Sequence, residues 1–523
     1  MTSDFGPRTD ILFGQSYYLR FDPKLWEAMQ PYPPLGTLYA ASYARSRGYS
    51  VALFDAMLAE SEDEWATALD RVQPRFACIF EDNFNYLSKM CLLRMREAAF
   101  KMVELAKARG CTVILCGADM TDHADLYFER GADYVLLGEG ELTLGELLDS
   151  LTGRSEQALE QILGLAYKSE VRSPQSEVAT LRLRTSDFGL WTSTPRRPDI
   201  HDLDSLPFPA WDLVDIPRYQ KIWRERHGYY SMNLVTTRGC PYQCNWCAKP
   251  IWGQRYNSRS PENVVAEMKW LKDKFHPDHI WFADDILGLK PGWIEQFAAL
   301  LREAEAVIPF KCLQRADLIS EKTAAALASA GCKTVWMGAE SGSQKILDAM
   351  DKGDTVDDIY QATSRLHAHG IKVGFFLQFG YPGETWEDVQ LTLKMVRECL
   401  PDDIGISVSY PLPGTKFFER VKLELGEKQN WIDSNDLALL YHGPFPPEFY
   451  RLLHTRVHRE FRLRRAWYDF RRDAPRLTAH HLRRLASIPY QWGGMWLSEQ
   501  RLKRMAACQL PSSESTIKSR GEI

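Results

Sequence analysis

Apolar and polar positions alternate along the first 150 residues in the rhythm of strands separated by helices. Short apolar runs with the length of buried strands occur at 10–14, 49–55, 76–80, 112–117 and 134–138. Apolar residues at helical spacing fill 34–48 and 92–109, and a glycine closes each of these segments. The pattern predicts a parallel, doubly wound, Rossmann-like sheet, whose ligands bind at the carboxyl ends of the strands.

The same alternation returns after residue 232. Candidate strands lie at 232–237, 279–284, 309–314, 333–338, 372–379 and 403–409. Candidate helices lie near 261–275, 291–305, 320–330, 355–369 and 385–400. Helix-capping residues precede three of them, namely Ser260, Ser320 and Thr385. Six strand–helix units predict a partial (β/α)6 TIM-like barrel with its active site at the strand C-termini.

These patterns predict an α/β protein of four regions. Residues 1–150 form the Rossmann-like domain, and 151–226 form a linker with proline-rich punctuation. Residues 227–425 form the partial barrel, and 426–523 form a helical, basic C-terminal region with a disordered tail.

Composition narrows the class of protein. The formal net charge of -5 provides no overall field that would favour nucleic acid. Eleven cysteines without a secretory leader are typical of reduced thiols plus a metal site. No apolar run has the length of a membrane span. We therefore expect a cytoplasmic protein.

The chemistry of the chain is concentrated in Thr237-Arg-Gly-Cys-Pro-Tyr-Gln-Cys-Asn-Trp-Cys247, which follows the first barrel strand. Cys240, Cys244 and Cys247 form a C-x3-C-x2-C run. Closed iron–sulfur and structural zinc sites use four protein ligands, so three thiolates suggest a cubane with one iron open to a substrate or cofactor. The alternative is three buried thiols, because free cysteine is often buried.

With this motif the chain resembles the radical S-adenosylmethionine (SAM) superfamily, and its cobalamin-binding subfamily in particular. The resemblance implies that the three cysteines bind a [4Fe–4S] cluster whose open iron chelates SAM. The reduced cluster would then cleave SAM to a 5′-deoxyadenosyl radical. Trp246 takes the aromatic position that the family places before the last cysteine, where it can face the adenine.

Further motifs carry the resemblance down the barrel. Asp284 and Asp285 end a strand like the family's acidic segment near the methionine amino group, and Glu340 lies in a G-x-E-S-G-like element. The resemblance implies that all three contact SAM. The alternatives are a helix cap or solvated loop for the aspartates, and an ion pair with Arg315 for Glu340.

The N-terminal region resembles the subfamily's cobalamin module. Its loops at 32–36, 116–121 and 138–141 match in order, which implies cobalamin contacts at Gly117, Thr121, Gly138 and Glu139. The alternative for the two glycines is an ordinary turn. No histidine precedes His123, so the histidine that ligates cobalt in D-x-H-x-x-G proteins is absent and cobalamin would bind without a protein ligand.

The reaction that the resemblance implies is methylation of an unactivated carbon of a small molecule or lipid, with methylcobalamin as donor. Alternatives are an oxidative cyclisation of the Mg-protoporphyrin monomethyl ester cyclase type, a non-enzymatic cofactor-binding module and, more weakly, tRNA methylthiolation. An electron donor such as flavodoxin or ferredoxin is implied. No catalytic residue is identified from the sequence.

The C-terminal region combines arginines with aromatic residues between 452 and 505. It is interpreted either as a solvated arginine face packed on the barrel or as an amphipathic surface that contacts anionic lipid or an extended apolar substrate. It carries no recognisable nucleic-acid motif.

Overall fold

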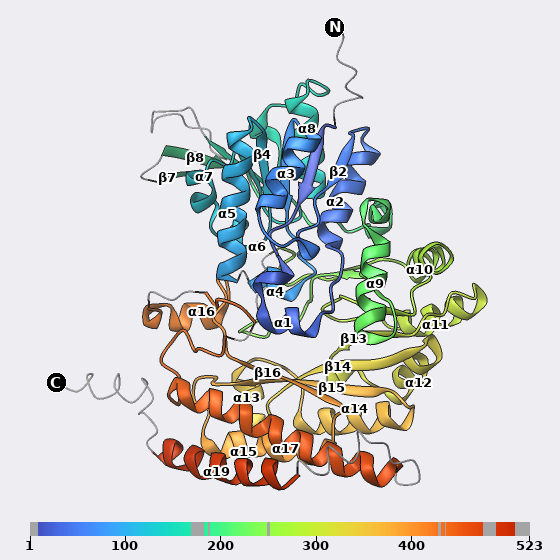
Figure 1. Cartoon of the computed structure of the whole chain (residues 1–523), viewed down its shortest axis with the longest axis vertical. Helices are drawn as coiled ribbons and strands as arrows, with labels where there is room; N and C mark the ends of the chain where they lie inside the picture. Colours follow the sequence, from blue (N-terminus) through green and yellow to red (C-terminus); the bar gives the residue numbers. More distant parts are fainter. Residues whose placement is uncertain are drawn as a thin grey trace, which may run out of the picture. The chain divides into compact units, whose positions relative to one another are not determined.

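The computed structural model describes residues 9–90, 92–168, 182–186, 189–247, 251–426, 430–434, 436–473 and 488–507, so the predicted tail lies outside the described residues. The chain forms two compact units. The first contains Met1–Pro241, Ala248–Phe310 and Asn430–Asp436, and the second contains Tyr242–Cys247, Lys311–Gln429 and Leu437–Ile523. Figure 1 traces the elements along the chain.

An eight-stranded sheet of order β2-β1-β3-β4-β5-β6-β8-β7 forms the N-terminal part. Its parallel strands are β1 (Ile11–Gly14), β2 (Val51–Leu53), β3 (Phe76–Phe80), β4 (Thr112–Cys116) and β5 (Tyr134–Leu136). Three antiparallel strands extend it, namely β6 (Leu165–Lys168), β7 (Arg182–Ser186) and β8 (Gly189–Ser193). They come from the stretch that the sequence analysis assigned to a linker.

Helices cover both faces of this sheet. One core joins α3 (Asp63–Val72) and α5 (Leu93–Ala108) to the sheet through Trp65, Met102 and Val103. The other core joins α2 (Leu35–Ser46) and α8 (Glu141–Leu151) to the opposite face. The doubly wound prediction is therefore confirmed. The remaining helices are α1 (Pro23–Ala28), α4 (Tyr86–Met90), α6 (Ala118–Asp122), α7 (Ala124–Glu129) and α9 (Ile216–His227).

The second sheet has six strands in the order β16-β15-β14-β13-β12-β9. They are β9 (Ser231–Leu234), β12 (His279–Phe282), β13 (Phe310–Gln314), β14 (Cys332–Glu340), β15 (Lys372–Phe379) and β16 (Asp403–Val408). Pairing is parallel for β9 with β12, β14 with β15 and β15 with β16. A short ladder of β10 (Thr237–Arg238) and β11 (Asn257–Ser258) stands beside it. These strands agree with the predicted partial barrel.

Capping residues start the barrel helices as predicted. The Ser260 and Ser320 hydroxyls accept hydrogen bonds from main-chain N–H groups three residues on, and Thr385 forms a capping box with Asp388. The helices are α10 (Pro261–Phe275), α11 (Trp293–Glu303), α12 (Glu321–Ala330), α13 (Gln344–Ala349), α14 (Val356–Ala368), α15 (Trp386–Cys399) and α16 (Lys416–Val421).

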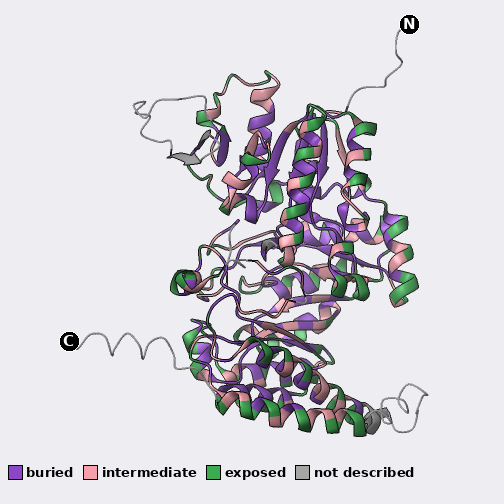
Figure 2. Cartoon of the chain, turned by 60° about the vertical axis from the view of Figure 1, so that its left-hand side comes forward, coloured by how far each residue is buried: buried purple, intermediate pink, exposed green. Residues whose placement is uncertain are grey.

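Two long helices complete the second unit. They are α17 (Pro447–Asp473), which packs on α15, and α19 (Ile488–Ala507), which packs on α17. Figure 2 colours the chain by burial; α17 contains both buried and exposed residues, whereas the described residues of α19 are mostly exposed or half-buried. This outcome confirms the helical C-terminal prediction. Among the described residues, none of the helices combines the length and the apolar character needed to cross a membrane.

Candidate metal centre and cofactor sites

The backbone before the first cysteine can be built only with glycine. Gly239 has φ +79°, and a Cβ added there would lie 2.3 Å from the main-chain oxygen of Arg255. Cys240 follows at once and is buried. The course of the backbone that enters Cys240 is therefore fixed by close packing within the first unit.

Asn245 anchors the part of the cysteine loop that belongs to the second unit. Its main-chain N–H donates to Met350 O at 3.0 Å, and its side-chain amide donates to Ala349 O at 2.8 Å. The Tyr381 hydroxyl donates to Asn245 Oδ1 at 2.8 Å, and the Phe417 N–H donates to Asn245 O at 3.0 Å. This one residue thus ties the loop to several elements, and no motif in the sequence pointed to it.

Trp246 is half-buried against an apolar cluster instead of standing free at the end of the loop. The cluster contains Ile346, Met350, Tyr381 and Phe417. The Trp246 indole Nε1–H finds no hydrogen-bond partner among the described residues. A buried indole donor usually has a partner, so a polar atom of a ligand can accept a hydrogen bond from this N–H.

Arg315 lies beside the second cysteine. Its Nη1 is 3.9 Å from Cys244 Sγ, and its guanidinium carbon is 3.7 Å from the centre of the Tyr242 ring. Asp317 and the main-chain oxygen of Lys352 hold the same guanidinium at 2.9 Å each. A fixed cation next to a thiol compensates the negative charge that a metal-bound thiolate carries.

The donor set fits an iron–sulfur cluster by its chemistry. Cysteine thiolates are the usual ligands of such clusters, and Cys244 is buried whereas Cys247 is half-exposed. Across the described parts of the chain, no three His, Cys, Asp or Glu side chains are gathered as the ligands of one metal ion. The three thiols share one short loop, and their role as ligands stays a prediction.

Asp284 braces the strand that leads into the cysteine loop. Its carboxylate accepts hydrogen bonds from the main-chain N–H and hydroxyl groups of both Thr236 and Thr237, at 2.7–3.0 Å. Burial raises its pKa to about 6, and these four donors oppose the rise. Its two oxygens are thus occupied by the protein, whereas the neighbouring Asp285 is half-buried. The predicted SAM contacts of both residues stay predictions.

Glu340 has the features of a residue held for a ligand. It is 6% exposed, has φ +54°, and lies where the register of β14 against β15 shifts. No hydrogen bond or ion pair of its side chain is found among the described residues, so the alternative of an ion pair with Arg315 does not apply to this structure. Burial raises its pKa to about 7, against the influence of Lys352 and Arg315. A strained, buried and unpaired carboxyl is typical of a functional site.

Three predicted cobalamin residues meet at the carboxyl edge of the first sheet. The Thr121 hydroxyl donates to Gly117 O at 2.8 Å and accepts from the Gly138 N–H at 3.4 Å. Gly117 has extended backbone, but a Cβ there would lie 2.8 Å from Cγ of Glu81. The absence of a side chain at Gly117 therefore allows a close approach between the loops after β3 and β4.

Glu81 borders a cavity at the same edge. The cavity is small, and Ser16, Ser88, Arg96 and Asp119 also line it. Burial raises the pKa of Glu81 to about 8. Two of the lining residues carry a buried hydroxyl with no hydrogen-bond partner in the described residues, namely Ser16 and Ser88. Unpaired buried polar groups at strand ends fit a polar ligand such as the amide-rich periphery of cobalamin.

Glu139 is paired with an arginine of the same unit, and its predicted cobalamin contact stays a prediction. Arg238 Nη1 donates to Glu139 Oε1 at 3.0 Å, and Arg238 Nη2 donates to Glu141 Oε1 at 2.7 Å. Their side chains are only 3–5% exposed, and the guanidinium also lies near the rings of Tyr39 and Phe84. We call these three charged residues the Arg238 triad. It joins the loop after β5 to the residue two positions before Cys240.

Sequence reasoning missed the Arg238 triad. The available signal was a strand-end arginine beside an expected cluster loop, together with two glutamates in Gly138-Glu-Gly-Glu141. Their separation of 97–99 residues left the pairing unspecified.

Comparison with known proteins places the barrel in a family. The radical SAM superfamily profile matches residues 234–396. An uncharacterized methyltransferase of Pyrococcus horikoshii is 28% identical over 393 residues, covering 74% of this chain and 78% of that protein. The anaerobic magnesium-protoporphyrin IX monomethyl ester cyclase of Rubrivivax gelatinosus is 25% identical over 415 residues, covering 77% and 68%.

The fold has a counterpart among solved structures. The cobalamin-dependent SAM radical enzyme OxsB, with aqua-cobalamin bound, matches with a TM-score of 0.70 and 17% identity, over 94% of this chain and 72% of that one. The match covers nearly all of this chain, so the two proteins share a fold. By its matched residues 234–396 and its ordered motifs, the barrel segment belongs to the radical SAM superfamily, and the relatives of the chain agree with this.

Proposed function

We propose that this protein methylates an unactivated carbon of a small-molecule or lipid substrate, with cobalamin as the methyl carrier. Two observations support the proposal. The barrel matches the radical SAM superfamily, and the carboxyl edge of the Rossmann-like sheet offers a place for a second cofactor. A relative described as a methyltransferase supports the methyl transfer.

The chain's own residues have distinct roles in this proposal. Cys240, Cys244 and Cys247 would hold a [4Fe–4S] cluster, which when bound supplies the electron that cleaves SAM. Arg315 balances charge at Cys244, and the unpaired carboxyl of Glu340 accepts hydrogen bonds from SAM hydroxyl groups. The unpaired Trp246 indole N–H donates to a polar atom of the same ligand.

The observation that carries the proposal is the edge at β1, β3 and β4. Two buried hydroxyls without partners in the described residues, those of Ser16 and Ser88, line a cavity there on loops of a doubly wound sheet. A radical SAM barrel without a second cofactor has no need of such an edge. The Glu81 carboxyl, with its pKa raised to about 8, is neutral at neutral pH and can donate a hydrogen bond to a ligand amide.

The test uses anaerobically purified full-length protein, reconstituted with iron, sulfide and cobalamin. We expect dithionite and SAM to give 5′-deoxyadenosine, and bound cobalamin to appear in the absorption spectrum. Cys244→Ala should abolish SAM cleavage, whereas Cys332→Ala, which removes a buried thiol outside the loop, should keep it. A protein that binds cofactors without forming 5′-deoxyadenosine would be a binding module, and the proposal would be wrong.

A cyclase is the second candidate, because the Rubrivivax gelatinosus relative covers most of this chain. Product mass separates the two reactions. Methylation adds one methyl group and forms S-adenosylhomocysteine when cobalamin is remethylated. Oxidative cyclisation adds oxygen or removes hydrogen and forms no S-adenosylhomocysteine.

A further inference from the structure

The outward side of α19 exposes large side chains that a folded protein normally covers. Tyr490, Trp492, Trp496 and Leu497 are 71%, 62%, 57% and 59% exposed. Helical spacing places Trp492 and Trp496 one above the other, and Tyr490 and Leu497 together further round the same solvent-exposed half of the helix. We call these four residues the aromatic face. Isolated exposed apolar residues are ordinary, but four on one helix form a contact surface.

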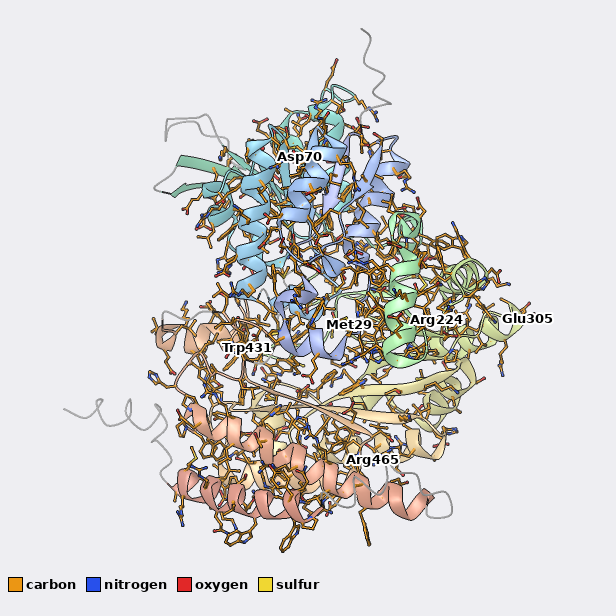
Figure 3. All side chains as sticks on the ribbon, in the orientation of Figure 1. Met29, Asp70, Arg224, Glu305, Trp431 and Arg465 are labelled. Atoms are coloured by element: carbon orange, nitrogen blue, oxygen red, sulfur yellow. The ribbon has the colours of Figure 1, made fainter. Side chains whose placement is uncertain are left out.

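Positive charge continues the aromatic face toward the end of the same helix. Arg501, Lys503 and Arg504 are all exposed and follow Leu497 within two turns. On the neighbouring helix α17, Arg451 and Arg462 are exposed as well. Figure 3 shows side chains projecting outward from α19, with Arg465 marking α17.

Two of the carboxylates on these helices are paired within the second unit. Glu460 is paired with Arg397 and Arg456, and Glu499 is paired with Arg456 and, at 3.8 Å, with Lys503. The two helices carry eleven arginines and lysines against five acidic residues, although the whole chain has a formal net charge of -5. The surface around the aromatic face is therefore cationic on an acidic protein.

The combination of residues identifies the partner. A cationic patch alone would suit any acidic surface, including that of an electron-donor protein. Tryptophan, tyrosine and leucine flanked by arginine and lysine are what an interfacial helix presents to lipid, because the rings enter the head-group boundary and the cations remain at the phosphates. A lipid surface thus accounts for both the apolar and the charged residues.

We propose that the aromatic face of α19 inserts into the interfacial layer of a membrane containing anionic lipids, with Arg501, Lys503 and Arg504 on the head groups. This contact is independent of the proposed reaction. It would hold the enzyme at a membrane surface and give it access to substrates dissolved in lipid.

Flotation of the full-length protein with vesicles tests the proposal. One set of vesicles contains phosphatidylcholine alone, and the other contains equal parts of phosphatidylcholine and phosphatidylglycerol. Three variants remove parts of the surface separately: Trp492→Ala with Trp496→Ala, Arg501→Gln with Lys503→Gln and Arg504→Gln, and both sets together. Circular dichroism and the yield of 5′-deoxyadenosine check that each variant is folded.

Matched controls change the same residue types elsewhere. Trp26→Ala removes another exposed tryptophan, from α1. Lys101→Gln, Lys221→Gln and Arg224→Gln remove three exposed positive charges from α5 and α9, so the net charge changes equally. These controls should float like the parent protein.

We expect the parent protein to float with anionic vesicles and far less with phosphatidylcholine. Loss of the three cations should lower the partition coefficient about a hundredfold, at about fivefold per charge. Loss of the two tryptophans should lower it by about tenfold or more. Equal flotation of all proteins would overturn the proposal. So would flotation that depends on the charges alone, or binding of a flavodoxin to this face without any binding to vesicles.

Discussion

Replacement of Arg238 by methionine should destabilise the first unit strongly. The substitution keeps an unbranched side chain of similar length but leaves Glu139 and Glu141 buried without their cation. Both carboxylates have side chains no more than 5% exposed. Removal of one partner from a buried ion pair costs about 3–5 kcal/mol, because the remaining charge stays out of water. A loss of this size is a large part of a typical unfolding free energy of about 5–15 kcal/mol.

The size of this loss in unfolding free energy can be tested by comparing removal of the cation alone with neutralisation of all three charges. In the triple variant Arg238→Met, Glu139→Gln and Glu141→Gln, no charge remains to be buried. Replacing a complete buried ionic group by neutral groups is often close to neutral in energy. The triple variant should therefore recover most of the loss. The surface pair Arg45–Asp212, whose side chains are 40% and 51% exposed, provides the control, and Arg45→Met should cost less than about 1 kcal/mol.

Urea denaturation of the cofactor-free proteins at neutral pH measures these differences. Iron content after reconstitution reports on the cysteine loop, because Arg238 stands two residues before Cys240. We expect Arg238→Met to lower both the midpoint of unfolding and the iron content. A midpoint for Arg238→Met equal to that of Arg45→Met, or a triple variant as unstable as the single one, would show that the two buried carboxylates do not depend on the Arg238 guanidinium.

Three further predictions follow from single positions. The pKa of Glu81 is raised from an ordinary 4.5 to about 8, so its contribution to stability is lost as pH rises through this window; Glu81→Gln should remove up to about 4–5 kcal/mol of that loss, and parallel pH profiles of unfolding for both proteins would contradict this. Gly239→Ala should abolish iron loading, whereas Gly253→Ala, also at positive φ but with nothing within 4 Å, should cost only about 1–2 kcal/mol and keep the iron. Thr385→Ala should cost about 1 kcal/mol in urea unfolding through loss of its capping box, while Thr385→Ser should restore most of it.

Local patterns predicted the barrel elements well. The strand at 372–379 and the helix at 261–275 have the bounds of β15 and α10, because a buried apolar run and a Ser–Pro start are signals within a few residues. Helix α13, at Gln344–Ala349, escaped prediction because six residues give too little periodicity. Strands β6 to β8 escaped because proline and polar residues between 151 and 226 indicated a linker.

The candidate site was predictable only where its signal lies within a few neighbouring residues. Cysteine spacing is local, so the loop at 240–247 could be found from the sequence. The partners of Asp284 are 47–48 residues away, and those of Arg238 are more distant still. The main-chain oxygen of Trp431, labelled in Figure 3, accepts from the Leu93 N–H across more than 300 residues. Only the folded chain determines such pairs.

The Arg238 triad limits how this architecture can be recombined. A chimera that takes its first 150 residues from another protein must bring two carboxylates at the turn after the fifth strand, or it leaves a guanidinium without counterions behind the cysteine loop. The turn at 138–141 and the start of the barrel must therefore be transferred together. Exchange of modules between members of the superfamily should succeed only where donor and acceptor share this charge arrangement.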